Sequence, residues 1–254
     1  MHSLLYGKNK HKGETATILI IAGSKKYSGA PVLATIGAFR SGAEMVFVMV
    51  PEGKETRNNV RRVYEAIVSK LHYNTRILNK ITACVIGPGL GHIKSKHVEI
   101  IKEIVAYLDE RNVYTILDAD AIHLYKLNVF DIFNHIILTP NHNERKNLIV
   151  KNDHFCLCKG HEDEIYKGTR LLIKVTMEKS ISKRACGIGD LLTGVLASFL
   201  SILDEKTENS LHLACRAVKL AILKSFNKNG YSIMATDIAE SFIYVIFDML
   251  DFYL

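Results

Sequence analysis

The chain has 254 residues, of which 48% are hydrophobic, enough for one large α/β domain or two small ones with a sizeable core. Its formal charge of +7 is spread along the sequence without a basic motif interleaved with aromatic residues, which argues against nucleic-acid binding. No stretch reaches the roughly 20 uninterrupted apolar residues of a membrane span, and the N-terminus lacks the apolar centre of a secretory signal. We therefore expect a globular, cytoplasmic protein without nucleic-acid or membrane partners.

The predicted elements alternate between apolar runs and helical patterns. Strands are expected at 17–22, 44–50, 82–86, 114–117, 135–138 and 155–158, with an edge-like strand at 170–175. Helices are expected after the first strand, from about 53, at 94–110, after 141, and at 190–203, 209–227 and 236–253. This alternation predicts an α/β fold, with residues 1–254 forming a single-domain α/β/α sandwich around a central, mostly parallel sheet.

The five cysteines are scattered, and only Cys156 and Cys158 are close neighbours. We expect the side chains of this C-x-C pair to point to opposite faces of an extended segment. A disulfide or metal pair is then not expected, and reduced, mostly buried thiols are predicted.

Glycine-rich or acidic turns follow five of the predicted strands, and they would converge on one edge of the sheet as a nucleotide-sized cleft. The first turn, 23–31, is either a ligand site or a flexible basic turn, and the loop at 87–91 either presents N–H groups to a phosphate or turns a corner. Asp118 and Asp120 either approach a Mg²⁺-bound phosphate or cap the next helix. Asn141 and Glu144 have the spacing of a capping-box variant.

The stretch RACGIGDLLTG reads as a glycine loop that runs into a helix. Gly187 and Gly189 would let the backbone approach a phosphate at the helix start. Asp190 is then either the N-cap of that helix or a general base beside the phosphate.

The ordered set of motifs resembles the ADP- or ATP-dependent NAD(P)H-hydrate dehydratases of the ribokinase-like superfamily. The motifs are KHKG at 10–13, GSKKYSGAPVLA at 23–34, GPGLG at 87–91, DADAI at 118–122, LTPNHNE at 138–144, KGHED at 159–163 and CGIGDLLTG at 186–194. The sequence TPNH makes the chain look like the eukaryotic branch, which uses ATP.

The resemblance implies a repair reaction that removes water from NADHX or NADPHX and restores NADH or NADPH. ATP would phosphorylate the ring hydroxyl, and phosphate would then leave. Asp190 would take the hydroxyl proton, while amides around Gly187 and Gly189 would hold the charge on the γ-phosphate. Mg²⁺ would bridge the phosphates largely through water, so no protein ligand for the metal is named.

The resemblance also implies which residues line the site. The hydrate would contact Gly29, Asn141, His142, Asn143, Glu144, Arg145, Lys146, Asn147 and Asp190. The nucleotide would contact Lys159, Gly160, His161, Glu162, Asp163, Ser180, Ile181, Ser182, Lys183, Arg184, Ala185, Cys186, Gly187, Ile188 and Gly189. A homo-oligomer is compatible with this reading.

The chain departs from the family pattern at several positions. Cys186 stands where the family usually has a further glycine, residues 145–147 are altered, and the segment between Asp163 and Ser182 is short. Two other functions stay open on the sequence alone: a small-molecule kinase of the same superfamily, and a nucleotide-binding protein without catalysis.

Overall fold

The computed structural model describes residues 16–177, 185–203 and 205–251. The strands are β1 Thr17–Ile21, β2 Met45–Val50, β3 Ile67–Lys70, β4 Ala83–Ile86, β5 Thr115–Leu117, β6 Ile136–Leu138, β7 Phe155–Cys158, β8 Asp163–Lys167 and β9 Arg170–Val175. The helices are α2 Ala30–Arg40, α3 Lys54–Val60, α4 Thr75–Leu78, α5 Ser95–Glu110, α6 Asp120–Lys126, α7 His142–Arg145, α8 Ile188–Ile202, α9 Thr207–Asn229, the 3₁₀ turn η1 Gly230–Ser232 and α10 Ala235–Asp251.

The strands form one nine-stranded sheet in the order β3-β2-β1-β4-β5-β6-β7-β8-β9. Strands β1 to β7 pair in parallel, and the hairpin β8–β9 continues the sheet antiparallel to β7. The mostly parallel sheet is therefore confirmed, and β9 lies at its edge as expected.

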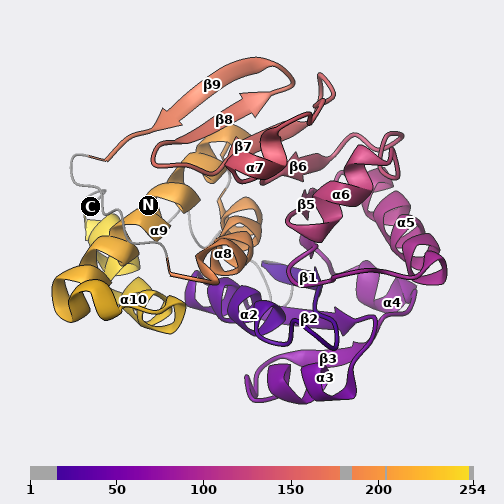
Figure 1. Cartoon of the computed structure of the whole chain (residues 1–254), viewed down its shortest axis with the longest axis horizontal. Coiled ribbons are helices and arrows are strands. Elements are labelled where there is room, and N and C mark those ends of the chain that lie inside the picture. The colour runs from indigo at the N-terminus through magenta and orange to yellow at the C-terminus, as the bar shows by residue number, and fades with distance from the viewer. Residues whose placement is uncertain (1–15, 178–184, 204, 252–254) are drawn as a thin grey trace, which may run out of the picture.

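The sheet is covered on both faces because successive side chains of its buried strands point to opposite sides. In β1, Ile18 and Ile20 join one hydrophobic core, while Leu19 and Ile21 join the other. Helices α2, α8, α9 and α10 contribute to the first core, and α5 and α6 to the second. Figure 1 shows these two groups on opposite sides of the sheet, with the β8–β9 hairpin projecting at one end.

Helices α2 and α8 approach each other closely through glycine. A Cβ atom added at Gly37 would overlap the carbonyl of Leu191, and one added at Gly194 would overlap the carbonyl of Ala34. The larger apolar side chains of α2 are only partly buried, so small residues make this contact. The close packing fixes the start of α8 next to the sheet.

The expected arrangement of the two neighbouring cysteines is wrong. Residues two apart in a strand share a face, because side chains alternate with a period of two. The Sγ atoms of Cys156 and Cys158 lie 3.7 Å apart, on the face of the second core.

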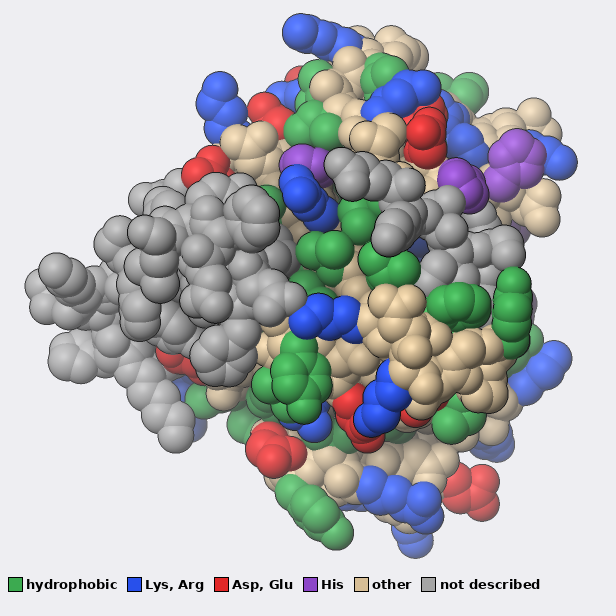
Figure 2. Space-filling view, turned by 90° about the vertical axis from the view of Figure 1, so that its left-hand side faces the viewer, with side chains coloured by type: hydrophobic (Ala, Val, Ile, Leu, Met, Phe, Trp, Pro, Cys, Tyr) green, Lys and Arg blue, Asp and Glu red, His purple; other side chains and the backbone are tan. Residues whose placement is uncertain are grey.

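The surface and the helices can be described for the same residues. Figure 2 shows Lys and Arg side chains scattered among other types over the face that it draws, without a single continuous basic patch. In the described part of the chain, every helix is too short or too polar to cross a membrane.

Candidate active site

The start of α8 depends on Gly187, which is the N-cap residue and has a φ of 90°. This left-handed conformation favours glycine, and a Cβ atom there would also overlap the side chain of Leu33. The helix begins at Ile188, so Asp190 lies inside its first turn. The prediction that Asp190 could be the N-cap is therefore wrong.

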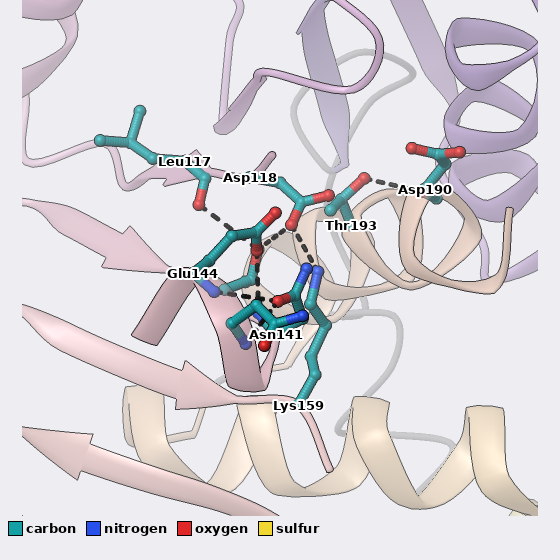
Figure 3. A network of polar contacts seen from close by, with 9 residues as sticks. Leu117, Asp118, Asn141, Glu144, Lys159, Asp190 and Thr193 are labelled. Carbon is teal, nitrogen blue, oxygen red and sulfur yellow. Dashed lines mark hydrogen bonds and ion pairs between the residues drawn. The ribbon is translucent and has the colours of Figure 1, made fainter. Parts of the chain in front are cut away.

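Asp190 has an unusual electrostatic environment for a carboxylate. Burial, followed by the negative charge of Asp118, raises the pKa of Asp190 from 3.8 to about 6, while the positive charge of Lys159 opposes this shift. Its backbone carbonyl accepts a hydrogen bond from Thr193 Oγ1 at 2.7 Å (Figure 3). Asp190 is thus a half-buried carboxylate that is ionised at neutral pH and more basic than usual.

Asp118 is the buried centre of a polar network at the sheet edge (Figure 3). It is 2% exposed, and its Oδ1 atom lies 2.5 Å from Lys159 Nζ and accepts a hydrogen bond from Thr139 Oγ1 at 2.7 Å. A buried carboxylate needs such partners, because an unpaired charge is costly to remove from water. The ion pair therefore holds the Lys159 ammonium in one place.

The Lys159 ammonium lies beside the glycine loop at the start of α8. A Cβ atom added at Gly189 would lie 3.5 Å from Lys159 Nζ, and no closer atom borders it. Lys159 thus presents its charge to the N-terminal turn of α8, where backbone N–H groups and the helix dipole already favour an anion. The combination is a cradle for a phosphate group, with Asp190 at its margin.

The two carboxylates of the Asp118-Ala119-Asp120 turn do not cap α6, contrary to the commoner expectation for such a motif. The N-cap of α6 is Ala119, which receives no side-chain cap and has a strained φ of 47°. Asp120 accepts a hydrogen bond from the Gly91 amide at 2.6 Å instead. Only Asp118 faces the phosphate cradle.

The glycine-rich loop at 87–91 turns a corner in this structure. The amides of Gly87, Leu90 and Gly91 donate to Ile21, Gly87 and Asp120 respectively. A Cβ atom at Gly87 would overlap the Asp118 carbonyl, so the glycine permits the close approach of two strand ends. These contacts favour a structural role for the loop over a phosphate site.

The first turn, 23–31, is held by hydrogen bonds at its start and is exposed to solvent at Gly29. Ser24 Oγ donates to the Gly89 carbonyl at 2.9 Å, and Thr56 Oγ1 donates to the Ser24 carbonyl at 2.7 Å. Gly29, the N-cap of α2, is exposed, and a Cβ atom there would meet nothing within 4 Å. Gly29 therefore borders open space, as a substrate-lining residue would.

The capping box predicted for Asn141 and Glu144 is confirmed. Asn141 Oδ1 accepts from the Glu144 amide at 3.0 Å, and Glu144 Oε2 accepts from the Asn141 amide at 2.8 Å. Asn141 also forms a parallel bridge with Lys159, which brings the start of α7 to the site. The Arg145 guanidinium donates to the Leu148 carbonyl at 2.7 Å.

The loop that begins at Lys159 is fixed by α9. Asp163 accepts from the Gly160 amide at 2.9 Å, and Lys219 Nζ lies 3.1 Å from Asp163 Oδ2. Lys219 also donates to the His161 carbonyl at 3.0 Å. Helix α9 thus positions the segment that the sequence assigned to the nucleotide.

Sequence reasoning did not identify Thr139 or Lys219 as parts of this arrangement. The contact of Lys219 has no signal in the sequence, because a lysine in a long helix is usually a solvated surface residue. The expected nucleotide contacts at 180–184 lie outside the described residues. Cys186, the departure in the glycine loop, is described and exposed.

The matching family model and similar curated proteins are described as NAD(P)H-hydrate dehydratases. The family model described as NAD(P)H-hydrate dehydratase matches residues 18–243. The ATP-dependent (S)-NAD(P)H-hydrate dehydratase of Entamoeba histolytica is 30% identical over 92% of this chain and 87% of its own length. The enzyme of the same name from Drosophila melanogaster is 28% identical over 91% of this chain and 86% of its own length.

Solved structures share the fold. A ribokinase-like superfamily protein of Enterococcus faecalis has a TM-score of 0.80 at 21% identity, covering 94% of this chain and 90% of that one. The ADP/ATP-dependent NAD(P)H-hydrate dehydratase of Bacillus subtilis, co-crystallised with ATP and Mg²⁺, has a TM-score of 0.69 at 19% identity. That likeness covers 96% of this chain and 93% of the Bacillus protein.

Proposed function

The chain belongs to the NAD(P)H-hydrate dehydratase family, and we propose from this that it is an ATP-dependent lyase that repairs (S)-NADHX and (S)-NADPHX. It removes water from the hydrated nicotinamide ring and restores NADH or NADPH. The observation that carries the proposal in this chain is Asp190, a carboxylate of raised pKa beside a lysine-lined phosphate cradle.

Asp190 acts as the general base. A base works best when its pKa lies near the working pH, and a value of about 6 leaves the carboxylate ionised yet more basic than an ordinary Asp. It accepts the proton of the ring hydroxyl as the hydroxyl oxygen attacks the γ-phosphate. Phosphate then departs with that oxygen as the ring C–O bond breaks, and a proton leaves the adjacent ring carbon, so that the C=C bond forms again and the elements of water are lost.

The γ-phosphate lies between the start of α8 and Lys159. Gly187 gives the loop its left-handed turn, and Gly189 leaves room beside the Lys159 ammonium. Preorganised N–H groups and a fixed cation stabilise the charge that develops during phosphoryl transfer. Asp118 keeps the ammonium in position through the 2.5 Å ion pair.

When bound with ATP, Mg²⁺ would neutralise charge on the phosphates. The described residues hold no group of three side chains that could form a metal cage. Because Mg²⁺ readily keeps water and phosphate oxygens as ligands, we propose that it is bound mainly by these. The resident side chains act on the phosphate itself.

The hydrated ring enters beside Gly29 and the start of α7. Gly29 borders open space, and Asn141 lies next to Lys159. The side chains of Asn141 and Glu144 cap α7. We therefore propose that these residues contact the substrate through the exposed atoms that the capping hydrogen bonds leave free. We propose on these grounds that the ring lies between Gly29 and Asp190.

One assay tests the activity. Incubation with NADHX, ATP and Mg²⁺ is expected to restore the absorbance of reduced nicotinamide, with one ADP and one phosphate released per NADH. No recovery above a control without enzyme would refute the proposal. Accumulation of a stable phosphorylated product would indicate a kinase, and unchanged turnover in Asp190→Asn would remove Asp190 from the mechanism.

We further propose ATP as the preferred donor, residues 1–254 as one domain, and the cytoplasm as the site of action. Initial rates with ATP and ADP compared at equal concentration test the donor. Limited proteolysis tests the domain organisation, fluorescence microscopy of the tagged chain tests the location, and light scattering after size exclusion tests whether a homo-oligomer forms.

A further inference from the structure

Cys156 and Cys158 form a thiol pair that the proposed reaction does not use. Both side chains lie on the α5–α6 face of the sheet, and their Sγ atoms are 3.7 Å apart. Cys156 is fully buried, whereas Cys158, the last residue of β7, is only partly buried. A small reagent can therefore reach the Cys158 sulfur from solvent, whereas the Cys156 sulfur lies buried next to it.

The surroundings of the pair give the two sulfurs different roles. A hydrogen bond from Cys156, followed by the charge of the Arg145 guanidinium, holds the pKa of Cys158 below its usual value, whereas the same hydrogen bond and burial raise the pKa of Cys156. Glu164 and Tyr166 lie opposite on β8, where Tyr166 donates to Glu164 at 2.6 Å. Cys158 is thus disposed to be the thiolate and Cys156 the thiol.

The other cysteines lack this arrangement. Burial raises the pKa of Cys84 and of Cys215, which keeps both thiols protonated. Cys186 is exposed, on the loop before α8. The pair on β7 differs from all three because it combines access, a cationic neighbour and a second thiol.

We propose that Cys156 and Cys158 form a modification site for hydroperoxides, in which Cys158 is the attacking sulfur and Cys156 resolves the product into a disulfide. The Cys158 thiolate bonds to the terminal peroxide oxygen, the O–O bond breaks, and the leaving alkoxide takes a proton to become an alcohol. Cys158 is then a sulfenic acid. Cys156 attacks that sulfur, the S–S bond forms, the S–O bond breaks, and the hydroxyl leaves with the Cys156 proton as water.

The disulfide would strain the end of β7. Residues two apart in a strand have Cα atoms about 6.6 Å apart, near the long end of the roughly 4.4 to 6.8 Å range that disulfides span. Strained disulfides are oxidising and readily reduced, which suits a reversible modification. Lys159 follows Cys158 directly, so the same strain reaches the ion pair with Asp118.

Trypsin makes the site easy to read, because cleavage after Lys151 and Lys159 releases residues 152–159 with both cysteines in one peptide. The full chain is treated with stoichiometric hydrogen peroxide, then unfolded and alkylated in denaturant, digested and analysed by mass spectrometry. The peptide is expected to lose two hydrogen atoms and to take up no alkyl group, and dithiothreitol should reverse both changes. Peptides containing Cys84 and Cys215 should remain fully alkylated in the same sample.

Two variants separate the roles. In Cys156→Ser, oxidation should stop at a Cys158 sulfenic acid that dimedone traps, and in Cys158→Ser the Cys156 thiol should stay reduced. The proposal is overturned if 152–159 remains doubly alkylated at a peroxide dose that oxidises Cys186, or if Cys158→Ser leaves oxidation of Cys156 unchanged. The wild-type readout needs no variant to fold and no turnover, so it stands apart from the dehydratase activity.

Discussion

Replacement of Asp190 by asparagine is expected to lower kcat sharply and to make the folded protein more stable near neutral pH. The carboxyl has a pKa of about 6 instead of 3.8, because burial and the charge of Asp118 disfavour its ionised form. Below about pH 4 the group is protonated in both the folded and the unfolded chain, so it carries no penalty. Between about pH 4 and 6 the unfolded chain ionises the group while the folded state keeps it protonated, so stability falls across this range and levels off above about pH 6.

The size of this effect follows from the shift. A rise of about two pKa units corresponds to a loss of about 3 kcal/mol at pH 7.5 and of about half that at pH 5. Asparagine has nearly the same shape and does not ionise. Asp190→Asn should therefore gain up to about 3 kcal/mol in the free energy of unfolding at pH 7.5, while kcat falls by about 10² to 10⁴.

Urea unfolding of both proteins at pH 7.5, 6 and 5, together with steady-state rates, measures both effects. Asp120→Ala is the control, because it removes the acceptor of the Gly91 amide and should lower stability at every pH. The reasoning is refuted if Asp190→Asn is no more stable than the wild type at pH 7.5, or if its gain does not shrink as the pH falls.

Further predictions concern the rest of the cradle. Lys159→Met should lower kcat by about 10² to 10³ and destabilise the fold by leaving Asp118 unpaired. The double variant with Asp118→Asn should recover stability in urea but not turnover, and recovered turnover would contradict a role for the lysine. Lys219→Met should raise KM for ATP about tenfold, equivalent to about 1.4 kcal/mol, with a smaller change in kcat. An unchanged KM would show that Lys219 of α9 does not support nucleotide binding. Gly187→Ala should lower the calorimetric Tm through about 1–3 kcal/mol of backbone strain, and an unchanged Tm would contradict this. The acid limb of kcat/KM should have its midpoint near pH 6, whereas a midpoint near 4 would point to a base other than Asp190.

The buried strands could be predicted because their signal is local. A parallel sheet covered on both faces selects continuous apolar runs, and β1 and β7 have such sequences, TILII and FCLC. Glycine or acidic residues directly after these runs mark the turns. The alternation of elements was sufficient for the fold class.

Strands β8 and β3, toward the two ends of the sheet, were not predicted from the sequence. Strand β8 has the sequence DEIYK, in which apolar and charged residues mix, and it is a strand because it pairs with β7 and β9. Strand β3, IVSK, lies at the opposite edge and pairs only with β2. In both cases long-range pairing, which the local sequence does not show, decides the structure.

The network around Asp118 shows how much of a site depends on strand order. Asp118, Thr139 and Lys159 each follow directly the last residue of a strand, β5, β6 and β7. The carboxyl ends of adjacent parallel strands meet at one edge, so these three side chains come together although Asp118 and Lys159 are 41 residues apart. With β6 between β5 and β7, Thr139 can donate to the carboxylate that also pairs with the lysine. After burial, which is the larger cause, the same carboxylate raises the pKa of Asp190, so this strand order sets the position of the cation and contributes to the basicity of Asp190.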